Sequence, residues 1–153
     1  MEDLEYAIKN FHKPRMSKIA EHLLKESDFL FDYFQPPTFE TYMVQIKLPD
    51  DSIIAINYFL VEVSSETPFL FLQFHCLLSE FVSPPSDALI RTVLESNNAV
   101  ELGQFCFDNN QLFFKSVMVD YPERPLDISL FSFYLRVFRG NLTAHRDALM
   151  KLI

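Results

Sequence analysis

Glycine and tryptophan are the residues that this sequence uses least. Its 153 residues include two glycines and no tryptophan, whereas glycine makes up about 7% of an average protein. A Rossmann turn or a Walker phosphate loop needs two or three glycines in close order, and Gly103 and Gly140 lie far apart. The shortage of glycine therefore excludes both of these nucleotide-binding loops.

Positive charge is also in short supply. The chain carries 13 Lys and Arg against 21 Asp and Glu, which gives a formal net charge of −8. Proteins that bind nucleic acids or anionic lipids need clustered basic side chains. The densest basic stretches, residues 9–18 and 136–151, are interrupted by apolar or acidic residues. We therefore expect neither a nucleic acid nor a membrane as a partner.

Cysteines and long apolar runs are few. Cys76 and Cys106 lie in apolar, strand-like segments without a C-x-x-C spacing, so we expect buried free thiols. Apolar runs such as residues 69–72 are far shorter than the ~20 residues of a membrane helix. The first residues, MEDLEYAIKN, are acidic and amphipathic, unlike a secretory signal. These features predict a soluble cytoplasmic protein.

No arrangement typical of an enzyme or a metal site is evident. His75 and Cys76 are adjacent, but neighbours on a strand point to opposite faces and cannot easily share an ion. There is no G-x-S-x-G nucleophile motif, and turn chemistry accounts for Asp50 and Asp51. We therefore expect a non-enzymatic protein with no catalytic residue, no metal and no cofactor.

The N-terminal half alternates between helix and strand patterns. Apolar residues at helical spacing predict a short helix over residues 4–11 that ends before Pro14, and Ser17 is a candidate cap for a second helix. Residues 29–34 fit either a continuation of that helix or an extended segment. Residues 42–48, 53–63 and 69–78 are predicted strands, since they are rich in β-branched and aromatic residues.

The C-terminal half predicts a helix, a hairpin and a long closing helix. Ser83 or Ser86 is suited to cap the first helix. The hairpin turns at Asn109-Asn110, because asparagine tolerates the positive φ of a two-residue turn. This turn predicts the pairs Phe107–Leu112, Phe105–Phe114, Gln104–Lys115 and Cys106–Phe113. Asp127 should cap the closing helix. Gly140-Asn141 is a plausible helix end, but we expect a continuous or gently bent helix that extends to Leu152.

The order of elements is thus α-α-β-β-β-α-β-β-α. Consecutive strands joined by hairpins, with helices between the runs, indicate an α+β fold with an antiparallel sheet and helices on one face. We predict a single domain over residues 1–153, with an N-terminal helical extension (residues 1–14) and an α+β core (residues 15–153).

One segment carries a family resemblance. Residues 95–98 (ESNN) end a predicted helix, residues 102–105 (LGQF) enter the hairpin, and Asp108 precedes the apolar residues 112–114 (LFF). Together with the element order, this segment resembles the type III secretion chaperone-like fold and is most similar to YbjN-like proteins, over about residues 17–152. The resemblance implies a dimeric, non-enzymatic protein that binds other polypeptides or regulates through them.

Seventeen phenylalanines leave more apolar surface than one sheet face is expected to cover. The closing helix has apolar residues outside its main stripe, and so do the outer faces of the third strand and the hairpin. A helix that is apolar nearly all round must be buried on more than one side, and a large exposed apolar patch ordinarily marks an interaction site. The candidate partner or dimer surface comprises Phe69, Phe71, Leu77, Phe113, Leu130, Phe133, Tyr134 and Val137.

Several functions remain compatible with this pattern. The leading hypothesis is a homodimeric protein-binding or regulatory module that associates with itself and with another polypeptide. A large intramolecular core would instead absorb the phenylalanines within one subunit. A regulatory domain that senses a small ligand is an alternative, and an enzyme with a dispersed site is a third.

Overall fold

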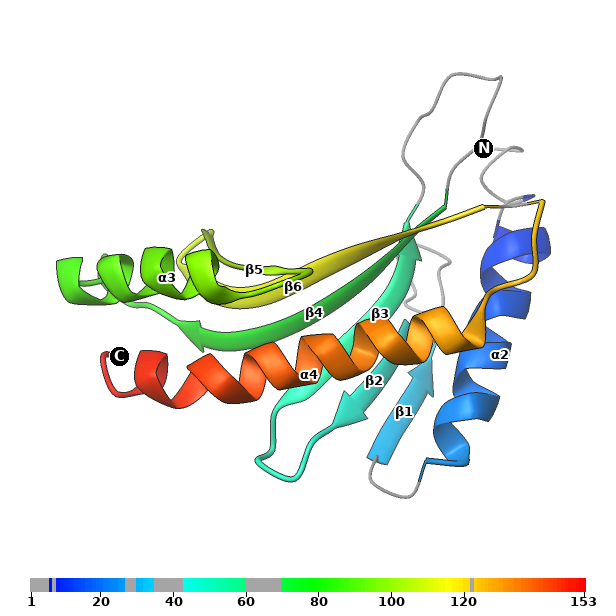
Figure 1. Ribbon diagram of the computed structural model, residues 1–153, viewed down its shortest axis with the longest axis horizontal. Coiled ribbons are helices and arrows are strands. Elements are labelled where there is room, and N and C mark those ends of the chain that lie inside the picture. Colours follow the sequence, from blue (N-terminus) through cyan, green and yellow to red (C-terminus); the bar gives the residue numbers. More distant parts are fainter. Residues whose placement is uncertain (1–5, 7, 27–29, 35–42, 60–69, 122) are drawn as a thin grey trace.

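The fold is a single antiparallel sheet with helices packed against it (Figure 1). The computed structural model describes residues 6, 8–26, 30–34, 43–59, 70–121 and 123–153. Within these residues, six strands form: β1 (Leu30–Phe34), β2 (Met43–Lys47), β3 (Ile53–Phe59), β4 (Leu70–Glu80), β5 (Gln104–Asp108) and β6 (Gln111–Asp120). The helices are α2 (Lys13–Leu24), α3 (Asp87–Ala99) and α4 (Ile128–Met150), with a π-helical turn η1 (Ile8–His12) before α2.

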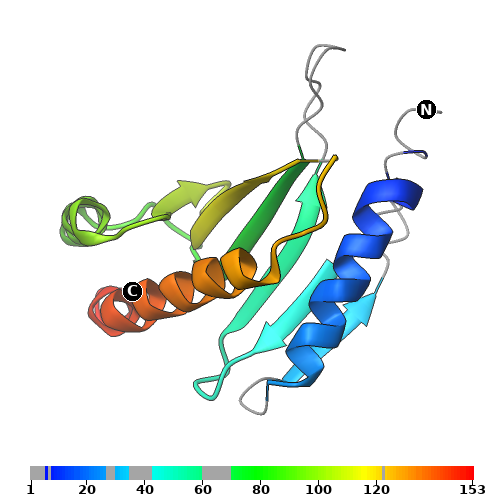
Figure 2. The same cartoon turned by 45° about the vertical axis from the view of Figure 1, so that its right-hand side comes forward.

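The strands lie in the order β1-β2-β3-β4-β6-β5, and all the pairs are antiparallel. Figure 2 shows α2 and α4 on the same side of the sheet, with α3 beside α4 at the β5 edge. Alternate strand residues that face α2 and α4 are buried, including Ile56, Phe74 and Phe114. The predicted α+β class, with an antiparallel sheet and helices on one face, is confirmed.

Two details of the N-terminal half differ from the sequence prediction. The helix does not end before Pro14, because Pro14 is the second residue of α2 and η1 precedes that helix directly. Pro14 lacks an N–H and its ring crowds the preceding turn, and it lies at the junction where the π-helical turn η1 changes to α2. Ser17 consequently lies within α2 and does not cap it. Residues 30–34, which fitted two structures, form the edge strand β1.

The C-terminal half agrees closely with the prediction. Asn109 and Asn110 have φ values of 47° and 62°, and all four predicted pairs between β5 and β6 are present. The Ser86 side chain caps α3 by accepting from the Leu89 N–H at 3.2 Å. Asp127 caps α4 by accepting from the Leu130 N–H at 3.0 Å, and α4 continues through Gly140 to Met150.

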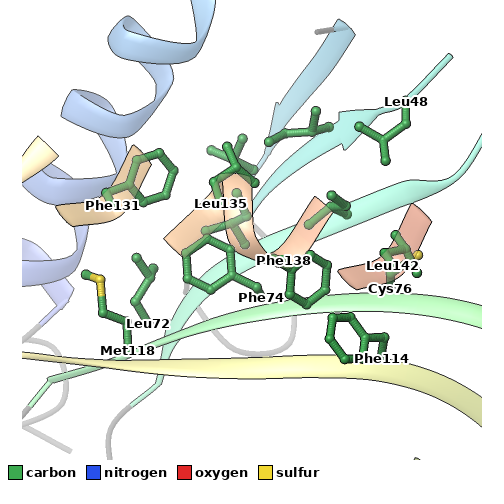
Figure 3. Close-up of a cluster of buried hydrophobic side chains, with 14 of the residues drawn as sticks. Leu48, Leu72, Phe74, Cys76, Phe114, Met118, Phe131, Leu135, Phe138 and Leu142 are labelled. Atoms are coloured by element: carbon green, nitrogen blue, oxygen red, sulfur yellow. The ribbon is translucent and has the colours of Figure 1, made fainter. Parts of the chain in front are cut away.

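Aromatic rings from α4 and the sheet make up the centre of the core. Figure 3 shows Phe131 and Phe138 of α4 pointing toward Phe74 of β4. Their ring centroids lie 5.7 and 5.9 Å from that of Phe74, and Phe138 lies 4.7 Å from Phe114 of β6. Ring pairs at these separations add to the free energy of burial. Part of the phenylalanine surplus is therefore used inside one subunit.

The segment that carries the family resemblance closes the β5 edge of the sheet. The Asn97 amide donates to the Phe105 carbonyl at 2.8 Å, and the Phe105 N–H donates to the Asn97 Oδ1 at 2.7 Å. One side chain thus satisfies both backbone groups of Phe105, which an exposed edge strand would offer to another chain. Position 103 requires glycine for steric reasons, because a Cβ there would lie 2.7 Å from the Phe114 Cζ.

We predict that Asn97→Ala lowers the free energy of unfolding by about 1–3 kcal/mol, because two backbone groups of Phe105 lose their partner. The neighbouring Asn98 is exposed, so Asn98→Ala should change stability by no more than about 0.5 kcal/mol. Urea unfolding followed by circular dichroism measures both variants. Equal losses in the two would show that the Asn97–Phe105 bonds do not protect this edge.

Candidate functional site

The sheet has one covered face and one open face. We define the open face as the side opposite α2 and α4, formed by Ala55 and Asn57 on β3, Phe71, Gln73, His75 and Leu77 on β4, and Phe113, Lys115, Val117 and Val119 on β6. No described helix lies over it (Figure 2). Its side chains are mostly half-buried or exposed, whereas their neighbours along each strand are buried. This face is a candidate interaction surface on the described part of the chain.

The predicted surface residues on the sheet fall on this open face. Phe71 is half-buried and is paired with Val119, and Leu77 is exposed and is paired with Phe113. Phe69 lies outside the described residues. The structure therefore brings Leu77 and Phe113 together on adjacent strands and places Phe71 farther along the same face.

Phe113 is less accessible than its position suggests. Its side chain is only 8% exposed, because its ring lies 4.7 Å from the His75 ring and 5.8 Å from the Lys115 ammonium. A cation above an aromatic face is attracted to it. Phe113 thus supports His75 and Lys115, which form the accessible surface at this point. Burial and the nearby Lys115 lower the pKa of His75, which keeps the imidazole neutral near pH 7.

Two exposed residues on the open face were missed by sequence reasoning. Val117 and Val119 are exposed on β6. They alternate with Ser116, Met118 and Asp120, which are buried. The period-two pattern of β6 was a signal that could have identified them once the face of Phe113 was known.

The predicted residues on α4 form a second surface on the opposite side of the molecule. Leu130 and Phe133 are 42% and 47% exposed. Tyr134 and Val137 are half-buried, and the Tyr134 ring is stacked 6.4 Å from Phe74 in the core. The helix therefore directs Leu130 and Phe133 outward and uses Tyr134 largely for its own packing.

A cavity of about 290 Å³ lies where β6 leads into α4. Val119 of the open face and Leu130 of α4 both line it, together with Asp120, Tyr121 and Arg124. The Arg124 guanidinium lies 4.6 Å from the centroid of the Tyr121 ring. This cavity is the point at which the two apolar surfaces approach each other.

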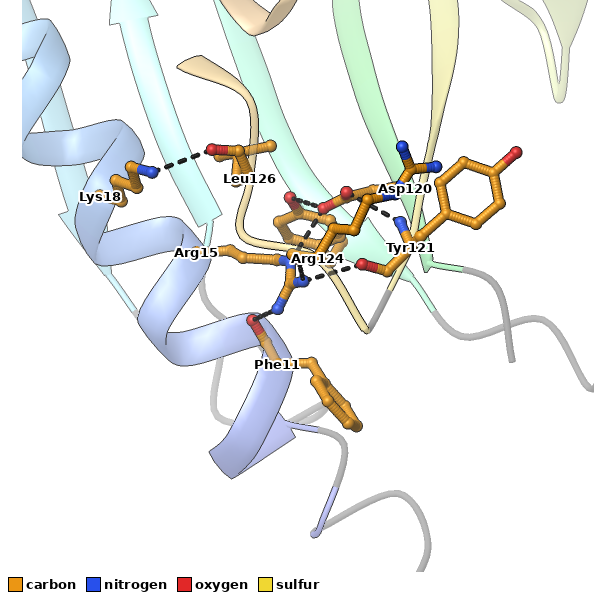
Figure 4. Close-up of polar contacts among 8 residues, drawn as sticks. Phe11, Arg15, Lys18, Asp120, Tyr121, Arg124 and Leu126 are labelled. Carbon is orange, nitrogen blue, oxygen red and sulfur yellow. Dashed lines mark hydrogen bonds and ion pairs between the residues drawn. The ribbon is translucent and has the colours of Figure 1, made fainter. Parts of the chain in front are cut away.

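A buried polar cluster lies behind this cavity (Figure 4). The Arg15 Nε donates to Asp120 Oδ2 at 2.9 Å, and the Tyr58 hydroxyl donates to the same oxygen at 2.9 Å. The other oxygen, Oδ1, accepts from the Tyr121 N–H at 2.8 Å. The Arg15 guanidinium also donates to the carbonyls of Tyr121 and Arg124. This cluster joins α2, the end of β6 and the connection to α4.

His12 is the unusual member of this region. Its side chain is 1% exposed, and its ring is stacked on Tyr58 with centroids 5.5 Å apart. Neither ring nitrogen has a hydrogen-bond partner among the described residues. Burial, with a smaller effect of nearby Arg15, lowers the pKa of His12 to about 4. The imidazole is therefore neutral near pH 7.

The described residues offer little for nucleophilic or metal chemistry. Burial raises the pKa of Cys76 to about 11 and also raises the pKa of Cys106, so neither thiol is activated as a thiolate. Within the described part of the chain, no group of three or more His, Cys, Asp or Glu side chains is placed to hold a metal ion. Across those same residues, no helix has both the length and the apolar character to cross a membrane.

No protein-family model, no curated protein and no solved structure matches the chain. The resemblance to YbjN-like proteins therefore stays a prediction. The Asn97, Gly103 and Phe105 pattern on which it partly rests has a structural role at the β5 edge.

We predict that Asp120→Asn lowers the free energy of unfolding by about 3–5 kcal/mol, because the buried Arg15 guanidinium loses its counter-charge. Tyr58→Phe removes only one hydrogen bond to the same carboxylate and should cost about 1–2 kcal/mol. Chemical unfolding of both variants provides the comparison. If Tyr58→Phe were as damaging as Asp120→Asn, the charge of Asp120 would not be what holds the cluster.

We predict that the protein loses stability in acid because His12 becomes protonated. Its folded pKa of about 4 lies below the ordinary value of 6.5, so protons bind more tightly to the unfolded chain. The contribution is complete above about pH 6.5, and roughly 2–3 kcal/mol of it is lost as pH falls to about 4.5. His12→Phe removes this titration. Urea unfolding at both pH values should show that the free energy of unfolding falls less in the variant than in the wild type. Equal falls in the two proteins would contradict the assignment to His12.

Proposed function

We propose that this protein is a homodimeric, non-enzymatic protein-binding or regulatory module whose subunits associate through α4. The observation that carries the proposal is the exposure of Leu130 and Phe133 on the outer side of α4, on a helix whose inner side already fills the core. Exposed aromatic and aliphatic residues of this kind are typical of protein interfaces.

The distribution of large and small residues along α4 supports self-association. Its first half carries the bulky Leu130 and Phe133, whereas its second half exposes Gly140, Thr143 and Ala144. A Cβ at Gly140 would meet no atom within 4 Å, so the space outside this residue is open. Antiparallel packing of two α4 helices about a two-fold axis would place the bulky half of each against the small half of the other.

The open face supports the second part of the proposal, the binding of another polypeptide. It lies on the opposite side of the sheet from α4, and its Val119 end approaches α4 at the cavity that Leu130 also lines. A module with one surface for its own copy and another for a partner agrees with what the resemblance to YbjN-like proteins implies.

A small-ligand sensor is a second candidate function. It is favoured by the cavity of about 290 Å³ at the start of α4, whose lining combines apolar Leu130 with charged Asp120 and Arg124. A thermal-shift screen against metabolites tests this candidate, and a raised melting temperature that Leu130→Trp abolishes would support it.

We also propose a reducing compartment such as the cytoplasm. Both cysteines are free, one buried and one half-buried, and disulfides are rare in such compartments.

Sedimentation equilibrium tests the dimer. The wild type should have a mass near twice 18.0 kDa, and Phe133→Asp, alone or with Val137→Asp, should sediment as a folded monomer because a carboxylate is placed in the apolar contact. Leu94→Asp on α3 is the matched control, since Leu94 is 61% exposed and lies outside α4. A monomeric wild type, or a dimer that Phe133→Asp leaves intact, would contradict association through α4.

A further inference from the structure

Three rows of side chains cross β4, β6 and β5 at the end of the open face farthest from Val119. Residues paired on adjacent antiparallel strands point to the same face, so the register continues the open face toward the β5–β6 turn. We name them the basic, middle and acidic rows. In that order they consist of His75, Lys115 and Gln104; of Leu77, Phe113 and Cys106; and of Glu80, Gln111 and Asp108.

The charges of the two outer rows are opposite and unneutralised. Glu80 accepts a hydrogen bond from the neutral Gln111 amide at 2.9 Å, which leaves its negative charge in place. Among the described side chains, neither Lys115 nor Asp108 forms an ion pair. Burial raises the pKa of Cys106 in the middle row, while Lys115 on one side lowers it and Asp108 on the other raises it. The cation and the carboxylates thus lie on opposite sides of the middle row.

The middle row is the least polar of the three. Leu77 is 44% exposed and Cys106 is half-buried, whereas Phe113 lies largely beneath the basic row. Successive residues on one face of a strand are about 7 Å apart. The basic and acidic rows therefore lie at similar distances from the middle row, on either side of it.

We infer that, where no other polypeptide occupies it, the open face packs against the open face of a second copy about a two-fold axis that runs along the middle row. The basic row of each copy then lies over the acidic row of the other. Lys115 lies over Gln111 of the second copy, between Glu80 and Asp108. This inference rests on the proposed protein-binding role of the open face and names the polypeptide that covers it.

The order of the rows is what favours a second copy. An isologous contact needs a surface that is complementary to itself under a two-fold rotation, and a basic and an acidic row on either side of an apolar row meet this requirement. The axis runs across the strands, so the strands of the two sheets stay nearly aligned, as they do in β-sandwiches.

The net charge of −8 opposes the association of any two copies at long range. Physiological salt screens charges that are more than about 8 Å apart, and the contacts between the rows lie within that distance. Nine residues from each subunit form the three rows, compared with about 20–30 in a standard interface. We therefore expect a weak association that depends on protein concentration.

Sedimentation equilibrium with exchanged charges tests this contact in the Phe133→Asp variant, in which α4 no longer contributes. As protein concentration increases, the mass should rise from 18.0 kDa toward twice that value. Adding Lys115→Glu should abolish the rise, because two acidic rows then meet. Adding Glu80→Lys with Asp108→Lys should abolish it as well, because two basic rows then meet. An equal mixture of these two variants should recover the dimer, since each supplies the charge that the other lacks.

Lys25→Glu is the matched control. It changes the net charge by the same amount as Lys115→Glu, and Lys25 is exposed at the end of α2, on the covered side of the sheet. It should leave the rise in mass intact, and circular dichroism verifies the fold of each variant. A constant mass of 18.0 kDa in the Phe133→Asp protein, an equal effect of Lys25→Glu, or no recovery in the mixture would overturn the inference.

Cross-linking tests the position of the axis in the wild-type protein. The middle row meets its own counterpart, so a bis-maleimide that spans about 10 Å, the distance between packed sheets, should join Cys106 of two copies. Cys106→Ser should abolish this product and Cys76→Ser should leave it, because Cys76 is buried on the other face. A product that forms equally without Cys106, or no product in the wild type, would contradict the axis. A wild type that is monomeric at low concentration contradicts only the association through α4.

Discussion

The buried ion pair between Arg15 and Asp120 is the contact on which the arrangement of the layers depends. It joins residues that are 105 positions apart, and the same guanidinium contacts carbonyls of the β6–α4 connection. A buried pair of this kind adds little net stability, because both charges lose their hydration. Its effect here is positional, because it holds α2 against the connection between β6 and α4.

The position of α2 set by this ion pair explains why one face of the sheet is covered and the other is free. Met16, Ile19 and Leu23 of α2 are fully buried, and α4 contributes Phe131 and Phe138 to the same side. With both helices committed to one face, the described elements provide only two layers. The alternation of a strand then forces every second side chain of β4 and β6 outward, which creates the open face and its exposed valines.

Polar contacts limit where this apolar surface can interact. Asn97 occupies the backbone groups of Phe105 at the β5 edge, so this position is closed to strand addition. His75 and Lys115 cover Phe113 on the open face. The side-chain face of β6 and the outer side of α4 stay accessible to a partner, whereas this point on the sheet edge does not.

Local patterns in the chain were sufficient for the hairpin register and for the cap at Asp127. They limited the cap of α3 to Ser83 or Ser86, and they favoured a helix that continues through Gly140 without excluding a break there. Each of these depends on residues that are neighbours in sequence, so their energies are set by short-range geometry. The Arg15–Asp120 pair, the burial of Phe113 beneath His75 and Lys115, and the side of β3 that faces the core depend on segments that meet only after folding. No spacing in the sequence encodes such meetings, and so the packing of helices on the sheet determined which apolar residues became core and which became surface.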